Sequence, residues 1–378
     1  MKKNNLLVIG IVLAFVLIIL LVSLKINGYL ILKDNKEIVI GSIMPFTGDG
    51  AVYGIEAKKA SDLAVEEINS NGGVNGKKLR IIYEDSKCNS SDALTSINKL
   101  INIDNTSVIL GGICSSENLG ASPVAESNKV IMFSPISTSP KITLAGDYIF
   151  RNIPSDAFSA REIAKDAMKK NYKVAILYEK AEYSQALISV FENNFKGNIV
   201  AKEAFASEDN DFKSQITKIL SKNPDAVYLA TSTPKKLAQA LKQLREFGFT
   251  KQLYSTEFAT SSDIVDSYKE EIEGTIIAEP RFDSGLSNTK IFLDKMKAKY
   301  NKFDIPEFYL ATTYDAVYIL KEAIENCGSK NTECIKKNLY SIKDRKGVAG
   351  SLTIDPNGDS ISEFSLKIIK DGKSIDYS

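Results

Sequence analysis

Two serine-containing stretches carry residue types that could bind a small anion. Ser115 and Ser116 occur in GGICSSENLGASPVAES, between an apolar run and a run of small residues that predicts a helix. Ser137 and Thr138 occur in FSPISTSP, which ends the next apolar run. Hydroxyl groups and the unpaired N–H groups at a helix start together form an anion site. The repeat of this pattern predicts a carboxylate site, whereas either stretch alone could be an ordinary helix cap or turn.

Two tyrosines and one glutamate follow other apolar runs in the same way. Tyr53 lies in TGDGAVYG, Tyr183 in EKAEYSQ and Glu257 in STEFAT. Open parallel sheets bind their ligands outside the carboxyl ends of the strands, so these positions are candidates for binding. Each also has a structural interpretation, because tyrosines are common in cores and a glutamate is stabilised in the first turn of a helix.

The composition excludes several kinds of chemistry. The chain contains no histidine, which excludes histidine acid–base catalysis, nucleophiles activated by histidine and histidine metal sites. It has no nucleophile elbow, P-loop or dinucleotide-binding glycine motif. Its 48 basic and 47 acidic side chains create no strong field that would attract nucleic acid. We therefore predict a protein without catalytic residues, metal or cofactor, whose partner is a small molecule.

Apolar runs alternate with helical patterns along most of the chain. The first series of runs covers 37–46, 79–85, 107–113 and 129–135, and the second covers 173–179, 198–205, 225–231, 251–256 and 274–280. Continuous β-branched runs separated by helices indicate parallel sheets covered on both faces. We predict an α/β protein with two doubly wound parallel-sheet lobes. A long helix over 308–327 and a terminal hairpin turned at Pro356-Asn357-Gly358 complete the pattern.

The predicted lobes are each made of two chain segments. Residues 37–156 with 284–347 form the first lobe, and residues 157–283 with 348–378 form the second. A hinge near residues 152–158 and 280–284 would let the lobes close on a ligand.

Residues 1–36 are predicted to be a membrane anchor and spacer. Residues 6–24 are uncharged and apolar, and such a run can cross a hydrocarbon core of roughly 30 Å as a helix. A cleavable signal peptide is the alternative, but its apolar region is usually shorter and ends in a small-residue cleavage site that this stretch lacks. We expect the globular part to lie outside the cell membrane, in an extracellular or periplasmic location.

Four cysteines follow this export segment, an even number that favours disulfides in an oxidising compartment. Three pairings are possible. Cys88 and Cys114 follow runs predicted to be adjacent parallel strands, and a strand spacing of about 4.8 Å suits a bridge. Cys327 and Cys334 enclose the short interval CGSKNTEC. We predict these two pairs, and the absence of C-x-x-C spacing disfavours a zinc or thioredoxin-like site.

Several motifs together resemble the leucine/isoleucine/valine-binding protein family, the type I periplasmic substrate-binding proteins of ABC transporters. The resemblance extends from about Glu37 to the C-terminus, and its motifs follow one another in the family's order. They are IVIGSIMPFTGDGAVYG, AVEEINSNGGVNGKKLRIIYEDSKC, GGICSSENLGASPVAES and FSPISTSPKIT. In that family, two lobes joined by three crossovers close on an amino acid, of branched-chain type, or a similar small molecule. They then present it to an ABC permease.

The resemblance implies roles for individual residues. Ser115 matches the serine that binds the ligand carboxylate, and Ile136 with Thr138 match positions that add backbone and hydroxyl contacts. Glu257 and Tyr183 match residues that hold the ammonium group and cover the ligand, and Tyr53 matches an aromatic near the pocket mouth. The pair Cys88 and Cys114 matches a disulfide of amino-acid-binding members.

Two features depart from the family pattern. Ile136 replaces a smaller residue, and TSTP stands where branched-chain receptors often have aromatics. The resemblance therefore does not specify the ligand's side chain. Thr231, the first residue of TSTP, is a further candidate for ligand binding. Two other functions are alternatives. One is the extracellular sensing domain of a signalling complex, and the other is an α/β enzyme that uses serine, lysine or carboxylates.

Overall fold

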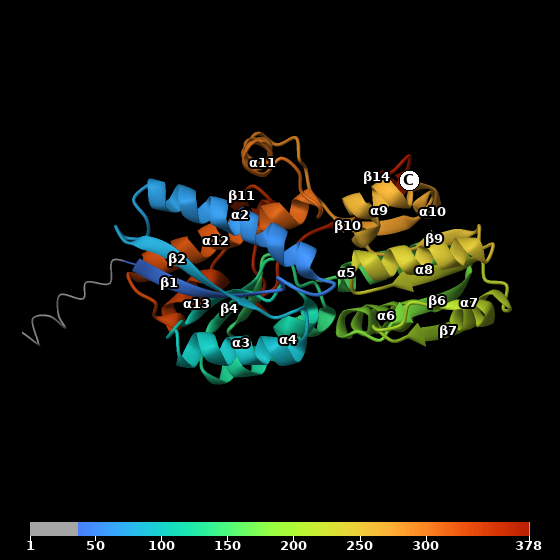
Figure 1. Ribbon diagram of the computed structural model, residues 1–378, viewed down its shortest axis with the longest axis horizontal. Coiled ribbons are helices and arrows are strands. Elements are labelled where there is room, and N and C mark those ends of the chain that lie inside the picture. Colours follow the sequence, from blue (N-terminus) through green and yellow to red (C-terminus); the bar gives the residue numbers. More distant parts are fainter. Residues whose placement is uncertain (1–36, 378) are drawn as a thin grey trace, which may run out of the picture.

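The first lobe is built on a five-stranded parallel sheet. The computed structural model describes residues 37–377 and shows two lobes side by side (Figure 1). The strand order of the first sheet is β2-β1-β3-β4-β5, and every adjacent pair is parallel. Its strands are β1 (Glu37–Met44), β2 (Lys78–Asp85), β3 (Val108–Gly111), β4 (Ile131–Ser134) and β5 (Ile149–Arg151).

Helices cover both faces of this sheet, because its strands are apolar on both sides. In β1, Ile40 and Met44 belong to one buried cluster and Ile43 to another. The first cluster includes α2 (Ala51–Ser70) and α12 (Glu307–Cys327), and the second includes α3 (Ser90–Asn102) and α4 (Ser115–Ser127). The lobe also contains the short helices η1 (Pro140–Leu144) and α13 (Thr332–Tyr340).

The second lobe is built on a seven-stranded mixed sheet of order β14-β13-β10-β9-β8-β6-β7. The strands from β10 to β7 in this order are parallel, and β13 and β14 add an antiparallel hairpin at the edge. The strands are β6 (Lys173–Glu179), β7 (Asn198–Phe205), β8 (Ala226–Ala230), β9 (Gln252–Tyr254), β10 (Ile276–Pro280), β13 (Phe364–Lys370) and β14 (Lys373–Asp376).

Helices again pack on both faces of the second sheet (Figure 1). The pair on one face is α5 (Ala157–Lys169) and α6 (Glu182–Asn194). The other face carries α7 (Lys213–Leu220), α8 (Pro234–Glu246), η2 (Glu257–Thr260), α9 (Ser262–Ser267) and α10 (Lys269–Ile272). The doubly wound prediction is therefore confirmed for both lobes.

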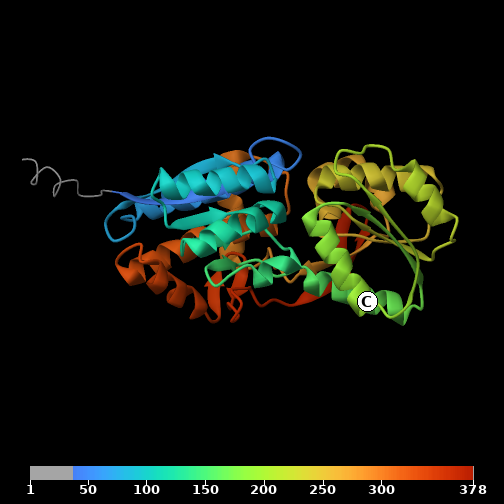
Figure 2. The same cartoon turned by 90° about the horizontal axis from the view of Figure 1, so that it is seen from below.

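The chain passes between the lobes three times, and Figure 2 shows these connections from below. The first follows β5, the second follows β10, and the third lies between β12 (Gly350–Leu352) and β13. After the second passage, α11 (Ser287–Tyr300) packs beside α2 and α12. The carboxyl ends of both sheets face the space between the lobes, which is where the candidate residues lie.

One predicted element is wrong. The last part of the chain forms two short hairpins, β11 (Arg345–Gly347) with β12 and β13 with β14, in place of one hairpin turned at Pro356-Asn357-Gly358. Gly358 instead accepts a hydrogen bond from the Arg151 N–H of β5, and Ile354 donates one to Ile342. These hydrogen bonds, together with the pairing of β12 with β11, place residues 348–360 in the first lobe. The predicted boundary at residue 348 therefore moves to about residue 360.

The predicted membrane anchor at residues 1–36 lies outside the described residues. Within residues 37–377, none of the helices combines the length and apolar character that a membrane crossing requires. All predicted strands of both series are present, whereas β5, α11 and α13 had no corresponding prediction.

Candidate functional site

A cavity of about 380 Å³ lies between the lobes, at the carboxyl ends of both sheets. Cavities of roughly 300–1,000 Å³ are typical of small-molecule sites. Of the nine residues proposed for the ligand, seven line it: Tyr53, Ser115, Ser116, Ile136, Thr138, Tyr183 and Glu257. Ser137 and Thr231 are buried beneath the cavity wall and have structural roles described below.

Ser115 and Ser116 are the first two residues of α4, whose N-cap is Cys114. The interpretation of these serines as simple N-caps is therefore wrong. The Ser115 hydroxyl oxygen accepts the Ser139 N–H at 3.2 Å, which leaves the hydroxyl proton able to donate to a ligand. Because the first N–H groups of a helix have no partner within the helix, this end of α4 can bind a carboxylate.

Glu117 fixes the loop that leads into α4. Its fully buried carboxyl accepts the N–H groups of Ile113, Cys114 and Cys88 at 2.8, 2.9 and 3.1 Å, and also the Ser86 hydroxyl. Burial raises the pKa of Glu117 to about 7, against the effect of these donors. The side chain therefore holds the loops after β2 and β3 together directly beneath the cavity.

The two predicted disulfides are confirmed, although the expectation that Cys88 and Cys114 follow adjacent strands is wrong, because β1 lies between β2 and β3. Cys88 and Cys114 are bonded with a Cα–Cα distance of 5.4 Å, and Cys327 and Cys334 with 5.9 Å. The first bridge lines the cavity, and the Ser116 hydroxyl donates to the Cys88 carbonyl at 2.7 Å. The second bridge joins α12 to α13 and does not line the cavity.

Removing the first bridge should affect both stability and ligand binding. For Cys88→Ser with Cys114→Ser, we expect a loss of roughly 3 kcal/mol of unfolding free energy, because loop-closure entropy returns to the unfolded chain. Ligand affinity should also fall, since the loop before Ser115 loses its covalent link to Cys88. The matched variant Cys327→Ser with Cys334→Ser should lose roughly 2 kcal/mol and keep its affinity. Urea unfolding and calorimetric titration measure both quantities, and equal affinity in the two double variants would contradict the bracing role.

The loop after β4 forms the next part of the cavity wall. Ile136 and Thr138 face the cavity, whereas the Ser137 hydroxyl points away and donates to the Gly112 carbonyl at 2.6 Å. Ser137 therefore ties the loop after β4 to the loop after β3. Alternation along the loop explains why Ile136 and Thr138 reach the site and Ser137 does not.

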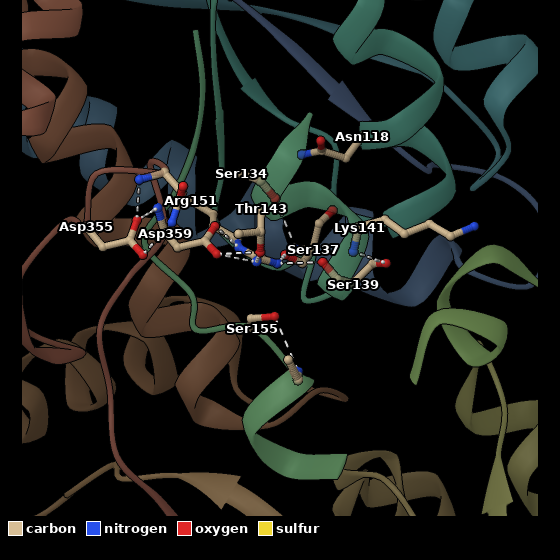
Figure 3. Close-up of polar contacts among 12 residues, drawn as sticks. Asn118, Ser134, Ser137, Ser139, Lys141, Thr143, Arg151, Ser155, Asp355 and Asp359 are labelled. Atoms are coloured by element: carbon tan, nitrogen blue, oxygen red, sulfur yellow. Dashed lines mark hydrogen bonds and ion pairs between the residues drawn. The ribbon is translucent and has the colours of Figure 1, made fainter. Parts of the chain in front are cut away.

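Arg151 supports this loop through hydrogen bonds, which Figure 3 shows. Its guanidinium donates to the carbonyl of Ser139 at 2.9 Å and to the Thr143 hydroxyl at 2.9 Å. It also forms a two-pronged pair with Asp359, with distances of 2.7 and 2.8 Å. Arg151 ends β5 and Asp359 precedes the third passage between the lobes, so this fully buried arginine links the binding loop to the hinge region.

Aromatic rings close the other side of the cavity. Tyr53, in the first turn of α2, lies 5.9 Å from Phe258 and 5.9 Å from Tyr309 between ring centroids. Gly54 follows it, where a Cβ atom would lie 1.7 Å from the Pro45 carbonyl oxygen. Only glycine lets α2 start this close to β1, and that approach places Tyr53 at the cavity.

Glu257 lines the hinge side of the cavity, and a second buried carboxyl group, Asp156, lies behind the lining residues Thr138 and Tyr183. Asp156 accepts the Tyr183 hydroxyl at 2.6 Å and the Thr138 hydroxyl at 2.7 Å. Glu257 accepts the Tyr309 hydroxyl. Burial, and then the charge of Asp156, raises the pKa of Glu257 to about 8. Burial also raises the pKa of Asp156 to about 6. A cation bound beside Glu257 would favour the ionised form of Glu257 and, through its charge, that of Asp156.

Thr231 is fully buried, and its hydroxyl donates to the Thr233 carbonyl at 3.1 Å. It shapes the loop after β8, whereas Ser232 and Thr233 of the same loop line the cavity. The predicted position is thus displaced by one or two residues along the chain. The strand ends one residue earlier than the apolar run suggested, at Ala230.

Sequence reasoning did not identify several lining residues. Glu179, Lys236, Phe258 and Tyr309 belong to this group. Glu179 and Phe258 could have been found, since one ends a predicted strand and the other adjoins Glu257. Tyr309 lies at the start of a helix from a distant chain segment, and no local pattern signals its approach to Glu257.

Two exposed ion pairs join the lobes across the rim of the cavity. Lys235 of α8 bonds Asp49 at 2.7 Å, and Lys141 of η1 bonds Glu182 of α6 at 2.6 Å. Exposed pairs of this kind are each worth about 0–1 kcal/mol. These ion pairs therefore stabilise the closed arrangement of the lobes only weakly.

The fold and cavity agree with a known family. The sequence model for the periplasmic binding protein family matches residues 37–364. The chain belongs to this family. The Leu/Ile/Val-binding protein of Escherichia coli K12 is 27% identical over 344 residues, which cover 89% of this chain and 91% of that protein. The resemblance inferred from the four motifs is thereby confirmed.

Solved structures of family members are similar over almost the whole described chain. A leucine-binding protein from Thermotoga maritima superposes with a TM-score of 0.82 and 27% identity, covering 90% of this chain and 98% of that one. A branched-chain amino acid transporter substrate-binding protein from Streptococcus pneumoniae, in complex with isoleucine, gives 0.80 and 28%, with coverage of 89% and 97%.

Proposed function

We propose that this protein captures an α-amino acid between its lobes and delivers it to an ABC importer, without catalysing a reaction. The observation that carries the proposal is the placement of opposite chemistries in one cavity. Ser115 and the start of α4 supply donors from the first lobe, and Glu257 supplies a carboxyl group from the second. The relatives named above, which bind branched-chain amino acids, support the ligand class.

A zwitterion would bridge the two lobes. Its carboxylate fits the α4 start and the loop of Ile136 and Thr138, and its ammonium fits Glu257, with the charge of Asp156 nearby. Tyr183, Tyr53 and Phe258 would cover the remaining surface. Since the two charged ends bind different lobes, the ligand would favour the closed arrangement, with motion at residues 152–158, 280–284 and the third passage.

Binding should release protons near neutral pH. The ammonium favours ionised Glu257 and Asp156, so it lowers the pKa values that burial has raised to about 8 and about 6. Affinity should therefore rise with pH from about 6 to 8. Without ligand, the unfolding free energy should instead fall as the pH rises from about 6 to 8. The folded state holds these protons more tightly than the unfolded chain does, and this contribution to stability is lost as the pH rises toward 8.

Calorimetric titration at pH 7 in buffers with different ionisation enthalpies measures the protons released, and thermal unfolding at pH 6 and 8 measures ligand-free stability. Glu257→Gln should remove most of the proton release. Equal apparent enthalpy in all buffers for the unaltered protein would contradict ionisation of these groups on binding.

The amino-acid proposal can be tested directly. Native mass spectrometry of protein purified with its ligand should reveal a bound amino acid, and titration with a panel of amino acids should give saturable binding. A ligand without an amino group, or turnover of the bound molecule, would contradict the proposal. Cross-linking in cells should recover an ABC permease, and recovery of a signalling receptor alone would instead indicate a sensing role.

We also propose that residues 6–24 anchor the protein in the membrane, with the lobes outside. The proposal rests on the uncharged apolar sequence of this stretch. N-terminal sequencing of protein taken from cell membranes should begin at or near Met1. A start near residue 25 would show that the segment is removed.

A further inference from the structure

The strand order of the two sheets determines which residues line the hinge side of the cavity and which line its outer edge. Glu257 follows β9, Ser232 follows β8, Glu179 ends β6 and Ser207 follows β7. Since the sheet order is β9-β8-β6-β7, these residues run from the hinge side toward the outer edge of the second lobe. In the first lobe, the order β2-β1-β3-β4-β5 places Thr138 toward the hinge side and Cys88 toward the outer edge.

The proposed function assigns the hinge side and the middle of this cavity to the ligand's charged ends. Glu257 would bind the ammonium, and Ser115 would bind the carboxylate. The ligand side chain must then extend toward the outer edge, between Glu179 and Ser232 on one lobe and the Cys88 loop on the other.

The outer part of the cavity is polar. From the second lobe it is lined by Glu179, Ser207, Ser232, Thr233 and Lys236, and from the first lobe by Asn89 and Ser90. The Glu179 and Lys236 side chains are both almost completely buried, with 2% and 4% of their surface exposed. Buried charged groups need hydrogen-bonding partners, so this end of the cavity is unsuited to a purely aliphatic group.

Both buried charges retain hydrogen-bonding capacity. Among the described residues, the bonds to Glu179 come from the Ser232 N–H at 2.7 Å and the Ser232 hydroxyl at 2.6 Å, and both reach the same oxygen, Oε2. Lys236 donates to the Asp209 carbonyl at 2.6 Å and to Asn210 Oδ1 at 3.2 Å, and an ammonium has three protons. The site can therefore accept one further hydrogen bond at Glu179 Oε1 and donate one from Lys236.

The charges of this region balance. Glu179 and Lys236 have opposite signs, and the other charged lining residues of the rim are in ion pairs: Asp49 with Lys235, Glu182 with Lys141, and Lys87 with Asp92. A charged ligand side chain would pair with either Glu179 or Lys236 and leave the charge of the other without compensation. An uncharged side chain with both a donor and an acceptor would satisfy Glu179 and Lys236 together.

We infer that the ligand is an α-amino acid whose side chain ends in an uncharged group that both donates and accepts hydrogen bonds, of the carboxamide class, with Glu179 and Lys236 as the residues that select it. The inference rests on the proposed function and narrows it away from branched aliphatic side chains. A site built to hydrogen-bond a polar group discriminates strongly against analogues that lack it, because its own groups are then left unpaired.

Calorimetric titration of the whole protein with glutamine, asparagine, leucine, isoleucine, lysine and glutamate tests the inference. We expect glutamine or asparagine to bind at least about tenfold more tightly than any other member of the panel. Tighter binding of an aliphatic or a charged amino acid would overturn the inference and leave the proposed function standing. Failure of the panel and of any other amino acid to bind would overturn the proposed function as well.

Variants identify the selecting residues. Glu179→Met should weaken carboxamide binding at least about tenfold and leave leucine affinity within about threefold, so the ratio of the two affinities changes. Ser232→Ala, a smaller change that keeps the backbone N–H donor, should shift the ratio in the same direction. Glu246→Met, at an exposed position of α8, serves as the control and should leave the ratio unchanged. An unchanged ratio in both Glu179→Met and Ser232→Ala would overturn the assignment.

Discussion

Replacing Glu257 with glutamine should weaken amino-acid binding by about 2–4 kcal/mol, or roughly 30- to 700-fold in Kd. Glutamine has nearly the same shape and can still accept the Tyr309 hydroxyl, so the change removes the charge and keeps the contact. The ligand ammonium then loses its ionised partner in a site where little water can replace it. Calorimetric titration at pH 8, where Glu257 is more fully ionised, should show the largest difference.

The same variant should fold as well as the unaltered protein. Burial and the nearby Asp156 disfavour the ionised form of Glu257 in the absence of ligand, so neutral glutamine removes an unfavourable charge. Thermal unfolding without ligand should give an equal or higher Tm at pH 8. Glu270→Gln, an exposed glutamate of α10, is the control for both measurements. Unchanged affinity in Glu257→Gln would exclude Glu257 from the ammonium site.

Replacing Arg151 with methionine should lower the unfolding free energy by about 3–5 kcal/mol. The arginine is fully buried, and its loss leaves the buried Asp359 carboxylate without a counter-charge and with only the Thr143 hydroxyl as a side-chain donor. The loop of Ile136 and Thr138 also loses support, because Arg151 donates to Ser139 within it. Urea unfolding followed by circular dichroism measures the change, since the chain contains no tryptophan.

The double variant Arg151→Met with Asp359→Leu separates the buried charge from the packing. It should be more stable than Arg151→Met alone, because neither charge then remains unpaired. Arg281→Met is the matched control at the second passage between the lobes, where Arg281 and Glu363 are 81% and 84% exposed. This control should change stability by less than about 1 kcal/mol. If Arg151→Met behaved like the control, the buried pair would have no structural importance.

Local patterns were sufficient to predict most of the scaffold. Continuous apolar runs such as SVILGGI and KVAILYE can only be buried on both faces, and the helices between them make the strands parallel. Residues that directly follow these runs, such as Ser115 and Glu257, therefore reach one edge of a sheet whatever the details of packing. The Cys88–Cys114 pairing was predicted correctly although β1 lies between β2 and β3, because both cysteines lie in loops at the same edge of the sheet.

The C-terminal segment was not predictable in the same way. Pro356, Asn357 and Gly358 have turn chemistry, but the partner of this turn is Arg151, which lies far away in the chain. A local pattern identifies a turn and does not identify the strand that it packs against. The contact between this turn and Arg151 could therefore be identified only from the tertiary structure.

The sequence by itself determined that this chain has two α/β lobes, two disulfides, and hydroxyl and carboxyl groups at the sheet edges. Only the tertiary structure decided which of these groups share a cavity. Tyr309 reaches Glu257 from 52 residues away, and Glu179 meets Ser232 from 53 residues away. Such contacts depend on how helices and loops of separate segments pack, because hydrogen-bonded partners need not be near in sequence. The polar character of the outer cavity, which bears on ligand choice, is a property of that packing.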